Sequence, residues 1–207
     1  RPPRSPLFPY TTLFRSTGRG VVSTCSYEAR KYGIHSAMPI SKAYKLCPDA
    51  VYLPVDMELY KSTSSRIMEI LREFSSRFQQ VSVDEAYMEL DKDITDYDKA
   101  IDVAKSIKEN ILRREGLTCS VGIAPNKVIA KIASDFNKPD GLTVVSPEEA
   151  KQFLDPLSIS KIPGIGKKTA LLLREMGLGP VGQLAVYDVP LLIARFGKVG
   201  LTKNPMA

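Results

Sequence analysis

Two long stretches of the chain repeat apolar residues at the spacing of an amphipathic helix. The first runs from Leu59 to Phe78 and the second from Ala100 to Leu112. An apolar stripe at this spacing predicts a helix that packs one side against a core. The apolar positions are Ile67, Ile70, Leu71, Phe74 and Phe78 in the first stretch, and Ala100, Val103, Ala104, Ile107 and Ile111 in the second. We therefore expect two long helices.

Segments that favour β-structure lie between and after these helices. Gln80–Leu90, Thr118–Ile123 and Leu142–Val145 are rich in residues typical of strands. A further short strand is expected at Val21–Thr24. Strands that alternate with helices predict an α/β (α+β) layer in which helices cover a sheet.

Shorter helices are expected on either side of this layer. Tyr27–Tyr32 predicts a helical turn that ends at Gly33, because glycine is typical just past a helix end. Pro39–Cys47 predicts a second short helix. Ser146 and Glu149 have the spacing of a capping box, which predicts the start of another helix.

These patterns divide the chain into four segments. Residues 1–16 are rich in proline and arginine and show no sustained period. We expect them to be foreign, a translated adapter or frameshift, with a disordered native arm as the alternative. Residues 17–55 form a small region, residues 56–145 the α/β layer, and residues 146–207 an all-helical region.

The composition fits a globular protein that binds a polyanion. Of 207 residues, 43% are hydrophobic, and 29 lysines and arginines against 23 acidic residues give a net charge of +6. A positive balance of this kind attracts nucleic acid. No apolar run approaches the roughly 18 residues that cross a bilayer, so we expect no membrane association.

Cysteine and histidine point to no metal or redox chemistry. Cys25, Cys47 and Cys119 are scattered and show no paired spacing, so neither a zinc site nor a disulfide framework is expected. A cytoplasmic location fits this usage. The single histidine, His35, has no second histidine to act with, and we assign it no function.

The adjacent carboxylates Asp84 and Glu85 are the first candidates for catalysis. Neighbouring side chains of a straight strand point to opposite faces, so both can reach one ion only where the chain bends. We therefore predict a hairpin or a strand end at this pair. Clustered carboxylates can hold Mg²⁺, which bridges phosphate oxygens. A solvated turn is the alternative.

A basic ridge is predicted on the helix that follows Pro125. Lys127, Lys131 and Ser134 recur at helical spacing, and Lys138 lies just beyond them. The apolar face is expected to carry Val128, Ile129, Ile132, Ala133 and Phe136. Ammonium groups in such a row neutralise a triphosphate or a nucleic-acid backbone, although an ordinary solvated face also fits.

Tyr27 and Arg30 are spaced so that both side chains face the same way on one helical turn. A phenol and a guanidinium in this arrangement can grip a phosphate through charge-assisted hydrogen bonds. A surface stack of the two side chains is the equal alternative.

The segment Ile162–Lys167 predicts a glycine hairpin between two short helical segments. Gly164 and Gly166 let a phosphate approach the backbone closely, and Lys167 opens the following helix. This is the helix-hairpin-helix arrangement, which holds a DNA backbone without reading its sequence. A plain turn between helices is the alternative.

Taken in order, these motifs resemble the Y-family DNA polymerases, in particular the DinB or polymerase IV branch. The resemblance runs from about Gly20 to about Gly197. The residues that carry it are Tyr27–Gly33, Ser82–Tyr87, Ser120–Ala124 with Asn126 and Lys127, Lys131–Ser134, Asn137–Gly141 and Pro163–Gly166.

The resemblance implies a DNA-directed DNA polymerase of the translesion type, with fingers at 17–55, a palm at 56–145 and a thumb at 146–207. It implies that Asp84 and Glu85 are catalytic carboxylates and ligands of a site for two Mg²⁺ ions. The incoming deoxynucleoside triphosphate would contact Thr24, Tyr27, Arg30 and Lys138. The DNA would contact Lys127, Lys131, Gly164, Gly166 and Lys167.

The chain departs from this family at both ends. The family begins with a strand that bears an Asp-x-Asp-like segment and an aromatic residue that excludes ribonucleotides, and residues 1–16 stand in its place. We therefore expect a metal ligand to be missing, polymerase activity to be impaired and apolar sheet surface to be exposed. Leu201–Ala207 does not match a thumb either.

Two other functions remain in view. A non-catalytic helix-hairpin-helix DNA-binding module would not need Asp84 and Glu85 together with Tyr27 and Arg30. A nuclease that uses the same carboxylates is less favoured, because no further acidic cluster or histidine accompanies them. We expect the protein to be a monomer whose partners are primer-template DNA and deoxynucleoside triphosphates. A processivity clamp is expected to bind the full-length parent only.

Overall fold

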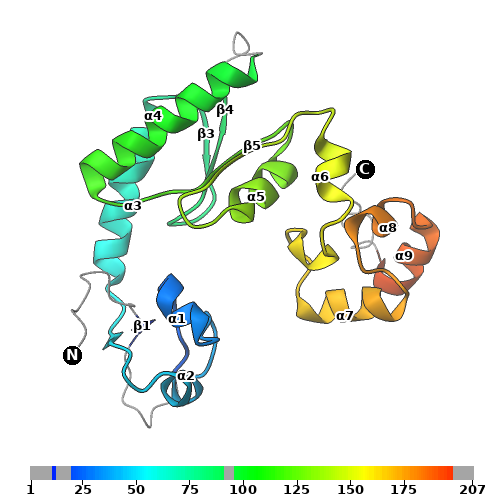
Figure 1. The fold of residues 1–207 in the computed structure, drawn as a ribbon, viewed down its shortest axis with the longest axis horizontal. Helices are drawn as coiled ribbons and strands as arrows, with labels where there is room; N and C mark the ends of the chain where they lie inside the picture. Colours follow the sequence, from blue (N-terminus) through cyan, green and yellow to red (C-terminus); the bar gives the residue numbers. More distant parts are fainter. Residues whose placement is uncertain (1–10, 13–19, 91–95, 198–207) are drawn as a thin grey trace. The chain divides into compact units, whose positions relative to one another are not determined.

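The computed structural model describes residues 11–12, 20–90 and 96–197, which belong to two compact units (Figure 1). The first unit is Arg1–Ser62 and the second is Thr63–Ala207. The boundary falls inside helix α3 (Met57–Arg72). The expectations for residues 1–10, 13–16 and 201–207 lie outside the described residues. No helix in the described ranges is both long enough and apolar enough to cross a membrane.

The first unit packs two short helices around a small core. Helix α1 (Tyr27–Lys31) and helix α2 (Ile40–Leu46) confirm the two short helices that the sequence predicts. Strand β1 (Thr11–Thr12) pairs in parallel with strand β2 (Tyr52–Leu53). The buried side chains are Val22, Cys25, Ala29, Ile34, Met38, Ile40 and Ala43.

The strand expected at Val21–Thr24 is wrong, because only a single bridge between Val21 and Pro39 forms there. Val22 donates to the carbonyl of Met38 at 2.8 Å and accepts from Ala37 at 2.8 Å. Pro39 has no N–H to continue the ladder, and α2 begins at the next residue. Val22 is therefore buried in the core without extending a sheet, while Val21 stays exposed.

Helix α3 is shorter than the apolar pattern predicts. It ends at Arg72, and Phe78 lies in strand β3 (Arg77–Gln80). Ser75, which is buried, forms the turn between them by accepting from the Arg77 N–H at 3.0 Å and donating to the Glu89 carbonyl at 2.6 Å. The spacing of Phe78 matched the helical period by coincidence.

The strands of the second unit form separate ladders instead of the single covered sheet that we expected. Strand β3 pairs antiparallel with β4 (Ala86–Glu89), and β5 (Val121–Ile123) pairs in parallel with β6 (Leu142–Val144). Each described ladder has two strands. The mixed α/β character is confirmed, and the unit is mostly helical (Figure 1).

Helix α4 (Tyr97–Glu115) confirms the second long helix. It begins at Asp96, whose carboxylate accepts from the Asp98 N–H at 2.9 Å, and it ends at Gly116 in the left-handed conformation, with φ of 66°. Its apolar face packs with α3, since Ile70, Ile107 and Ile111 form one buried cluster.

The last part of the second unit is helical. It contains α6 (Ala150–Leu154), the 3₁₀ turn η1 (Ile159–Lys161), α7 (Lys167–Glu175), α8 (Val181–Ala185) and α9 (Val189–Phe196). The capping box is confirmed, because Ser146 N–H donates to Glu149 at 3.2 Å and Glu149 N–H donates to Ser146 Oγ at 3.3 Å. The division of the chain into fingers, palm and thumb stays a prediction.

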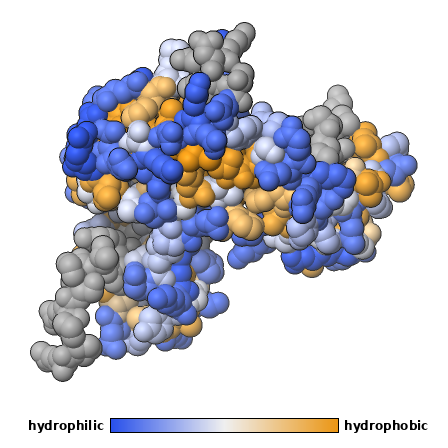
Figure 2. Space-filling model, turned by 45° about the horizontal axis from the view of Figure 1, so that its top comes forward, coloured by the Kyte–Doolittle hydropathy of each residue, from blue (hydrophilic) through white to orange (hydrophobic). Residues whose placement is uncertain are grey.

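Apolar side chains also reach the surface of the second unit (Figure 2). Val81 is 52% exposed and Val83 is 44% exposed, on the turn between β3 and β4. Leu112 and Leu117 are exposed around the end of α4. Exposed aliphatic side chains are common on folded proteins, and these positions identify no partner by themselves.

Helix α5 (Lys127–Phe136) lies against β5 at a close backbone contact. A Cβ added at Gly122 would meet the carbonyl oxygen of Ala130 at 2.2 Å and the amide nitrogen of Ser134 at 2.5 Å. Only glycine fits between strand and helix at these distances. This contact fixes the depth at which α5 packs on the strand.

We therefore expect Gly122→Ala to destabilise the protein by about 1–3 kcal/mol or more, because backbone atoms must separate to admit the methyl group. Urea unfolding monitored by circular dichroism measures the change. Gly179→Ala is the matched control, because a Cβ there meets nothing within 4 Å. Equal midpoints for the two variants would contradict the close contact.

Candidate functional site

Asp84 and Glu85 lie in the turn that joins β3 to β4, as the sequence predicted. The Glu85 carbonyl accepts from the N–H groups of Val81 at 2.9 Å and Ser82 at 3.2 Å, which closes the turn. Ser82 Oγ donates to Asp84 Oδ1 at 2.6 Å and accepts from the Asp84 N–H at 3.3 Å. The turn thus holds both carboxylates at one end of the hairpin.

Helix α5 brings its lysines to this turn. Lys131 forms an ion pair with Glu85, and its ammonium also lies 3.3 Å from Asp135. Lys138 lies 2.5 Å from the other oxygen of Asp135. The result is a row of alternating charges, which we call the charge row: Glu85, Lys131, Asp135 and Lys138.

The charge row shifts the pKa of its central members. Burial favours the neutral form of Lys131, but the bonds to Glu85 and Asp135 outweigh burial and raise the pKa of Lys131 above 10.5. Burial acts against the Asp135 carboxylate too, yet Lys138 and Lys131 lower its pKa below 3.8. Both groups are therefore charged at neutral pH.

Lys127, at the start of α5, contacts the β3–β4 hairpin with its side chain. Its ammonium donates to the Gln79 side chain at 2.5 Å and lies 5.8 Å from the ring centroid of Tyr87. Asn126 begins α5 by accepting from the Ile129 N–H at 3.0 Å. Lys127 and Lys131 of the predicted basic ridge therefore face the β3–β4 hairpin.

The predicted apolar face of α5 is correct only in part. Ile129, Ile132 and Ala133 are buried, but Val128 is 37% exposed and Phe136 is 55% exposed. Phe136 packs its ring edge against Phe153, with centroids 5.2 Å apart. A ten-residue helix against a two-stranded ladder buries a narrower stripe than a helix in a full sheet would.

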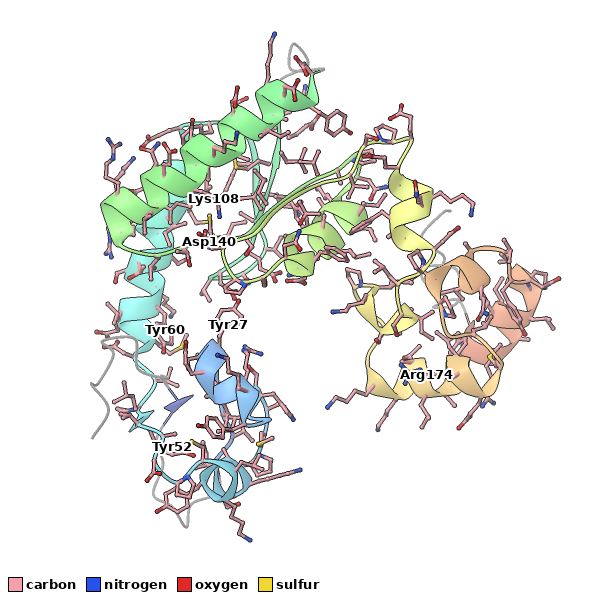
Figure 3. The ribbon with its side chains drawn as sticks, viewed as in Figure 1. Tyr27, Tyr52, Tyr60, Lys108, Asp140 and Arg174 are labelled. Carbon is pink, nitrogen blue, oxygen red and sulfur yellow. The ribbon has the colours of Figure 1, made fainter. Side chains whose placement is uncertain are left out.

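Thr24, Tyr27 and Arg30 belong to the first unit, where all are exposed. Tyr27 is labelled on α1 in Figure 3. The guanidinium carbon of Arg30 lies 5.9 Å from the Tyr27 ring centroid, so the two side chains do face the same way. This geometry fits a phosphate grip and the alternative surface stack equally well.

The predicted glycine hairpin joins η1 to α7. Gly164 has φ of +83°, which strongly favours glycine, and the Ile165 N–H donates to the Ile162 carbonyl at 3.0 Å. Gly166 begins α7 with no side-chain cap, and Lys167 follows it at the surface. Arg174 Nη2 reaches from α7 to Ser158 Oγ at 3.5 Å, next to η1 (Figure 3).

The residues at the hairpin turn fit a divalent cation of the Mg²⁺ type in part. Mg²⁺ prefers carboxylate oxygens and often takes only one or two from the protein, with phosphate and water completing its shell. Asp84 and Glu85 provide two such groups. No cluster of three or more potential ligand residues occurs in ranges 11–12, 20–90 and 96–197.

Some residues of the site were missed by sequence reasoning. Asp135 joins Lys131 to Lys138, and its place one helical turn after Lys131 was a usable signal. Gln79 and Tyr87 contact Lys127 from the hairpin. That contact depends on how the β3–β4 hairpin packs against α5, and no local sequence pattern predicts it.

Comparison with known proteins identifies two family matches. Residues 12–135 match the impB/mucB/samB family, and residues 147–178 match the helix-hairpin-helix motif of the same family. The second match includes the glycine hairpin.

Curated relatives agree with these matches. The chain is 56% identical over 191 residues to DNA polymerase IV 2 of Methanosarcina mazei, covering 92% of this chain and 52% of that protein. It is 54% identical to DNA polymerase IV of Methanoculleus marisnigri, with the same coverage. The chain thus spans about half the length of these relatives.

Solved structures give the same result. DinB from Sulfolobus solfataricus superposes with a TM-score of 0.87 at 37% identity, covering 95% of this chain and 58% of that one. The insertion ternary complex of Dbh DNA polymerase superposes with a TM-score of 0.86 at 36% identity, covering 94% of this chain and 58% of that one.

The charge row predicts an acid-dependent loss of stability. Because the folded pKa of Asp135 lies below 3.8, its ion pairs stabilise the fold above that pH and are lost as the pH falls through the folded value. We expect Asp135→Asn to be less stable than the parent at pH 6, by less than about 1 kcal/mol for so exposed a group. The difference should shrink as the pH falls below 3.8.

Urea unfolding at a series of pH values measures this difference. Asp102→Asn is the control, since Asp102 is 78% exposed and lies 3.9 Å from Lys105. A gap between the parent and Asp135→Asn that stays constant down to pH 2 would show that the carboxylate charge is not responsible.

Proposed function

Because the chain belongs to the impB/mucB/samB family, the Y-family DNA polymerases of the DNA polymerase IV type, we propose that residues 20–197 supply part of a site for template-directed nucleotidyl transfer, with the activity of the unmodified chain impaired. The substrates would be primer-template DNA and deoxynucleoside triphosphates, and the reaction would serve synthesis past damaged bases. The observation that carries the proposal is the pairing of the Asp84–Glu85 turn with the lysines of α5.

Asp84 and Glu85 are proposed to hold Mg²⁺. With Mg²⁺ held there, the two carboxylates would place positive charge beside the phosphates, which is the chemistry that in-line displacement at phosphorus by a primer 3′-hydroxyl requires. Glu85 is 41% exposed and paired with Lys131, so its carboxyl group is accessible from solvent. The role of this chain's residues is to present two fixed oxygen ligands on a turn that hydrogen bonds already hold.

Lys131 and Lys138 are proposed to compensate the charge of the substrates. Each ammonium is already held by Asp135, so neither side chain must give up all of its rotamer freedom when phosphate binds. Lys138 would contact the triphosphate, while Lys131 and Lys127 would lie toward the DNA. A triphosphate and a DNA backbone both require positive groups of this kind.

Thr24, Tyr27 and Arg30 are proposed as further contacts of the triphosphate. The phenol and guanidinium lie on one side of α1 and are open to solvent, which suits a ligand that arrives from outside.

Gly164, Gly166 and Lys167 are proposed to bind the DNA backbone. The start of α7 offers backbone N–H groups that no side-chain hydrogen bond caps, and a Cβ at Gly166 would meet nothing within 4 Å, so a ligand can approach there. This feature alone also supports the second candidate, a DNA-binding module without catalysis. We also propose that the protein is a monomer that acts in the cytoplasm. A processivity clamp is proposed as a partner of the full-length parent only.

Primer extension tests the proposed catalysis. We would insert residues 20–197 of this chain in place of the matching part of the Methanosarcina mazei polymerase, which is 56% identical. The chimera should extend a primer in Mg²⁺. Asp84→Asn and Glu85→Gln should each reduce the rate about 100-fold or more, because each removes a proposed metal ligand.

Asp98→Asn, an exposed carboxylate on the first turn of α4, is the control and should keep full activity. The unmodified chain is measured in parallel. If both Asp84→Asn and Glu85→Gln still extend the primer, the proposed metal site is rejected. The second candidate, a DNA-binding module without catalysis, is then favoured.

Duplex binding tests the glycine hairpin. We expect Lys167→Ala to weaken binding equally for unrelated DNA sequences and to reduce the slope of log K against log salt by about one. Gly164→Ala should also weaken binding, because alanine is strained at φ of +83°. Fluorescence anisotropy of a labelled duplex at several KCl concentrations measures both effects.

Lys105→Ala is the control, because Lys105 is an exposed lysine on α4 and not part of the glycine hairpin. A salt slope for Lys167→Ala equal to that of the parent would mean that Lys167 contacts no phosphate.

A further inference from the structure

Lys108 on α4 is a lysine that is withdrawn from solvent and fully engaged with the chain around it. Its side chain is 18% exposed. The ammonium donates to the carbonyl of Cys119 at 2.7 Å, to the carbonyl of Asp140 at 2.9 Å and to the Asp140 carboxylate. An ammonium has three N–H groups, so all three are used. Lys108 and Asp140 are labelled in Figure 3.

These acceptors lie where two strands begin. Cys119 comes shortly before β5, and Asp140 comes shortly before β6. The two segments are also bonded to each other, since Val121 N–H donates to the Gly141 carbonyl at 2.9 Å and Gly141 N–H donates to Ser120 Oγ at 3.1 Å. Lys108 therefore ties helix α4 to the starts of both strands.

The segment 137–141 has little freedom of its own. A Cβ added at Gly141 would meet the carbonyl oxygen of Asn137 at 2.4 Å, so the turn is closed on itself. Asn137 donates to Thr143 Oγ1 at 3.0 Å. Lys138 lies inside this closed turn and reaches Asp135 of the charge row. A displacement of Asp140 would thus be passed on to Lys138.

We propose that Lys108 is a positioning residue for the triphosphate site. It holds the closed turn 137–141 against β5 and thereby sets where the Lys138 ammonium meets the nucleotide. This proposal rests on the proposed function, in which Lys138 contacts the triphosphate. Lys108 itself touches no substrate, because its N–H groups are taken by Cys119 and Asp140.

Nucleotide binding by the whole chain tests the link to Lys138. A fluorescent dATP analogue is titrated in Mg²⁺ against the parent, Lys108→Met, Lys138→Ala and the double variant. Each single change should weaken binding about tenfold, the size of one charge-assisted hydrogen bond. The double variant should bind no more weakly than Lys138→Ala, because Lys108 acts through Lys138.

Two further variants control this titration. Lys108→Arg keeps the charge and several donors and should restore most of the affinity. Lys105→Met, on the same helix and 60% exposed, should bind as the parent does. Parent-like binding by Lys108→Met, or losses that add in the double variant, would overturn the proposal.

Amide hydrogen exchange by mass spectrometry separates this proposal from the proposed function. In Lys108→Met, exchange in segment 137–141 should rise at least about tenfold while α7 stays protected, which shows that the fold is kept. Unchanged exchange in that segment overturns the positioning role, whatever nucleotide binding shows. Faster exchange supports it, and failure of the parent to bind nucleotide would then count against the proposed function alone.

Discussion

The close contact between Gly122 of β5 and the backbone of α5 is the constraint on which the candidate site depends. Glycine leaves the strand without a side chain at the point where the Ala130 carbonyl would otherwise be obstructed. With α5 this close to the ladder, Lys131 reaches Glu85 in the turn between β3 and β4, and Lys127 reaches Gln79 in β3. A helix held farther from β5 would move Lys131 away from Glu85 and weaken that ion pair of the charge row.

The charge row explains why a site so rich in ions is compatible with a stable fold. Acidic and basic side chains alternate along it, so no like charges are placed side by side without a counter-ion between them. Isolated ion pairs at this exposure contribute little to the free energy of unfolding. Their main consequence is that the ammonium and carboxylate groups are already oriented, which reduces the cost of receiving a charged ligand.

Much of the fold and of the candidate site could be predicted from the sequence wherever neighbouring residues determine the local structure. The bend at Asp84 and Glu85, the capping box at Ser146 and the glycine hairpin before α7 follow from backbone geometry and hydrogen-bonding preferences. Helix α4 follows from its apolar stripe, although it extends beyond the predicted Ala100–Leu112 at both ends.

The sequence-based predictions are wrong where tertiary contacts determine the local structure. The apolar period placed Phe78 in α3, but the hydrogen bonds of Ser75 end that segment and begin a strand. Phe136 matched the core stripe of α5, yet it lies at the surface against Phe153. The role of Lys108 depends on Cys119 and Asp140, which lie farther along the chain, and a search for motifs passes over it. Asp135 differs, because its partners Lys131 and Lys138 are close in the sequence and gave a usable signal.

Paramagnetic broadening by Mn²⁺ in the presence of a deoxynucleoside triphosphate would test the central claim most directly. Mn²⁺ takes the same oxygen ligands as Mg²⁺ and broadens the NMR signals of nearby residues. The account predicts selective loss of signals from Asp84, Glu85 and the lysines of α5, and none from the exposed Lys151–Asp155 pair on the helical region. Uniform broadening, or broadening that spares the turn at Asp84 and Glu85, would contradict it.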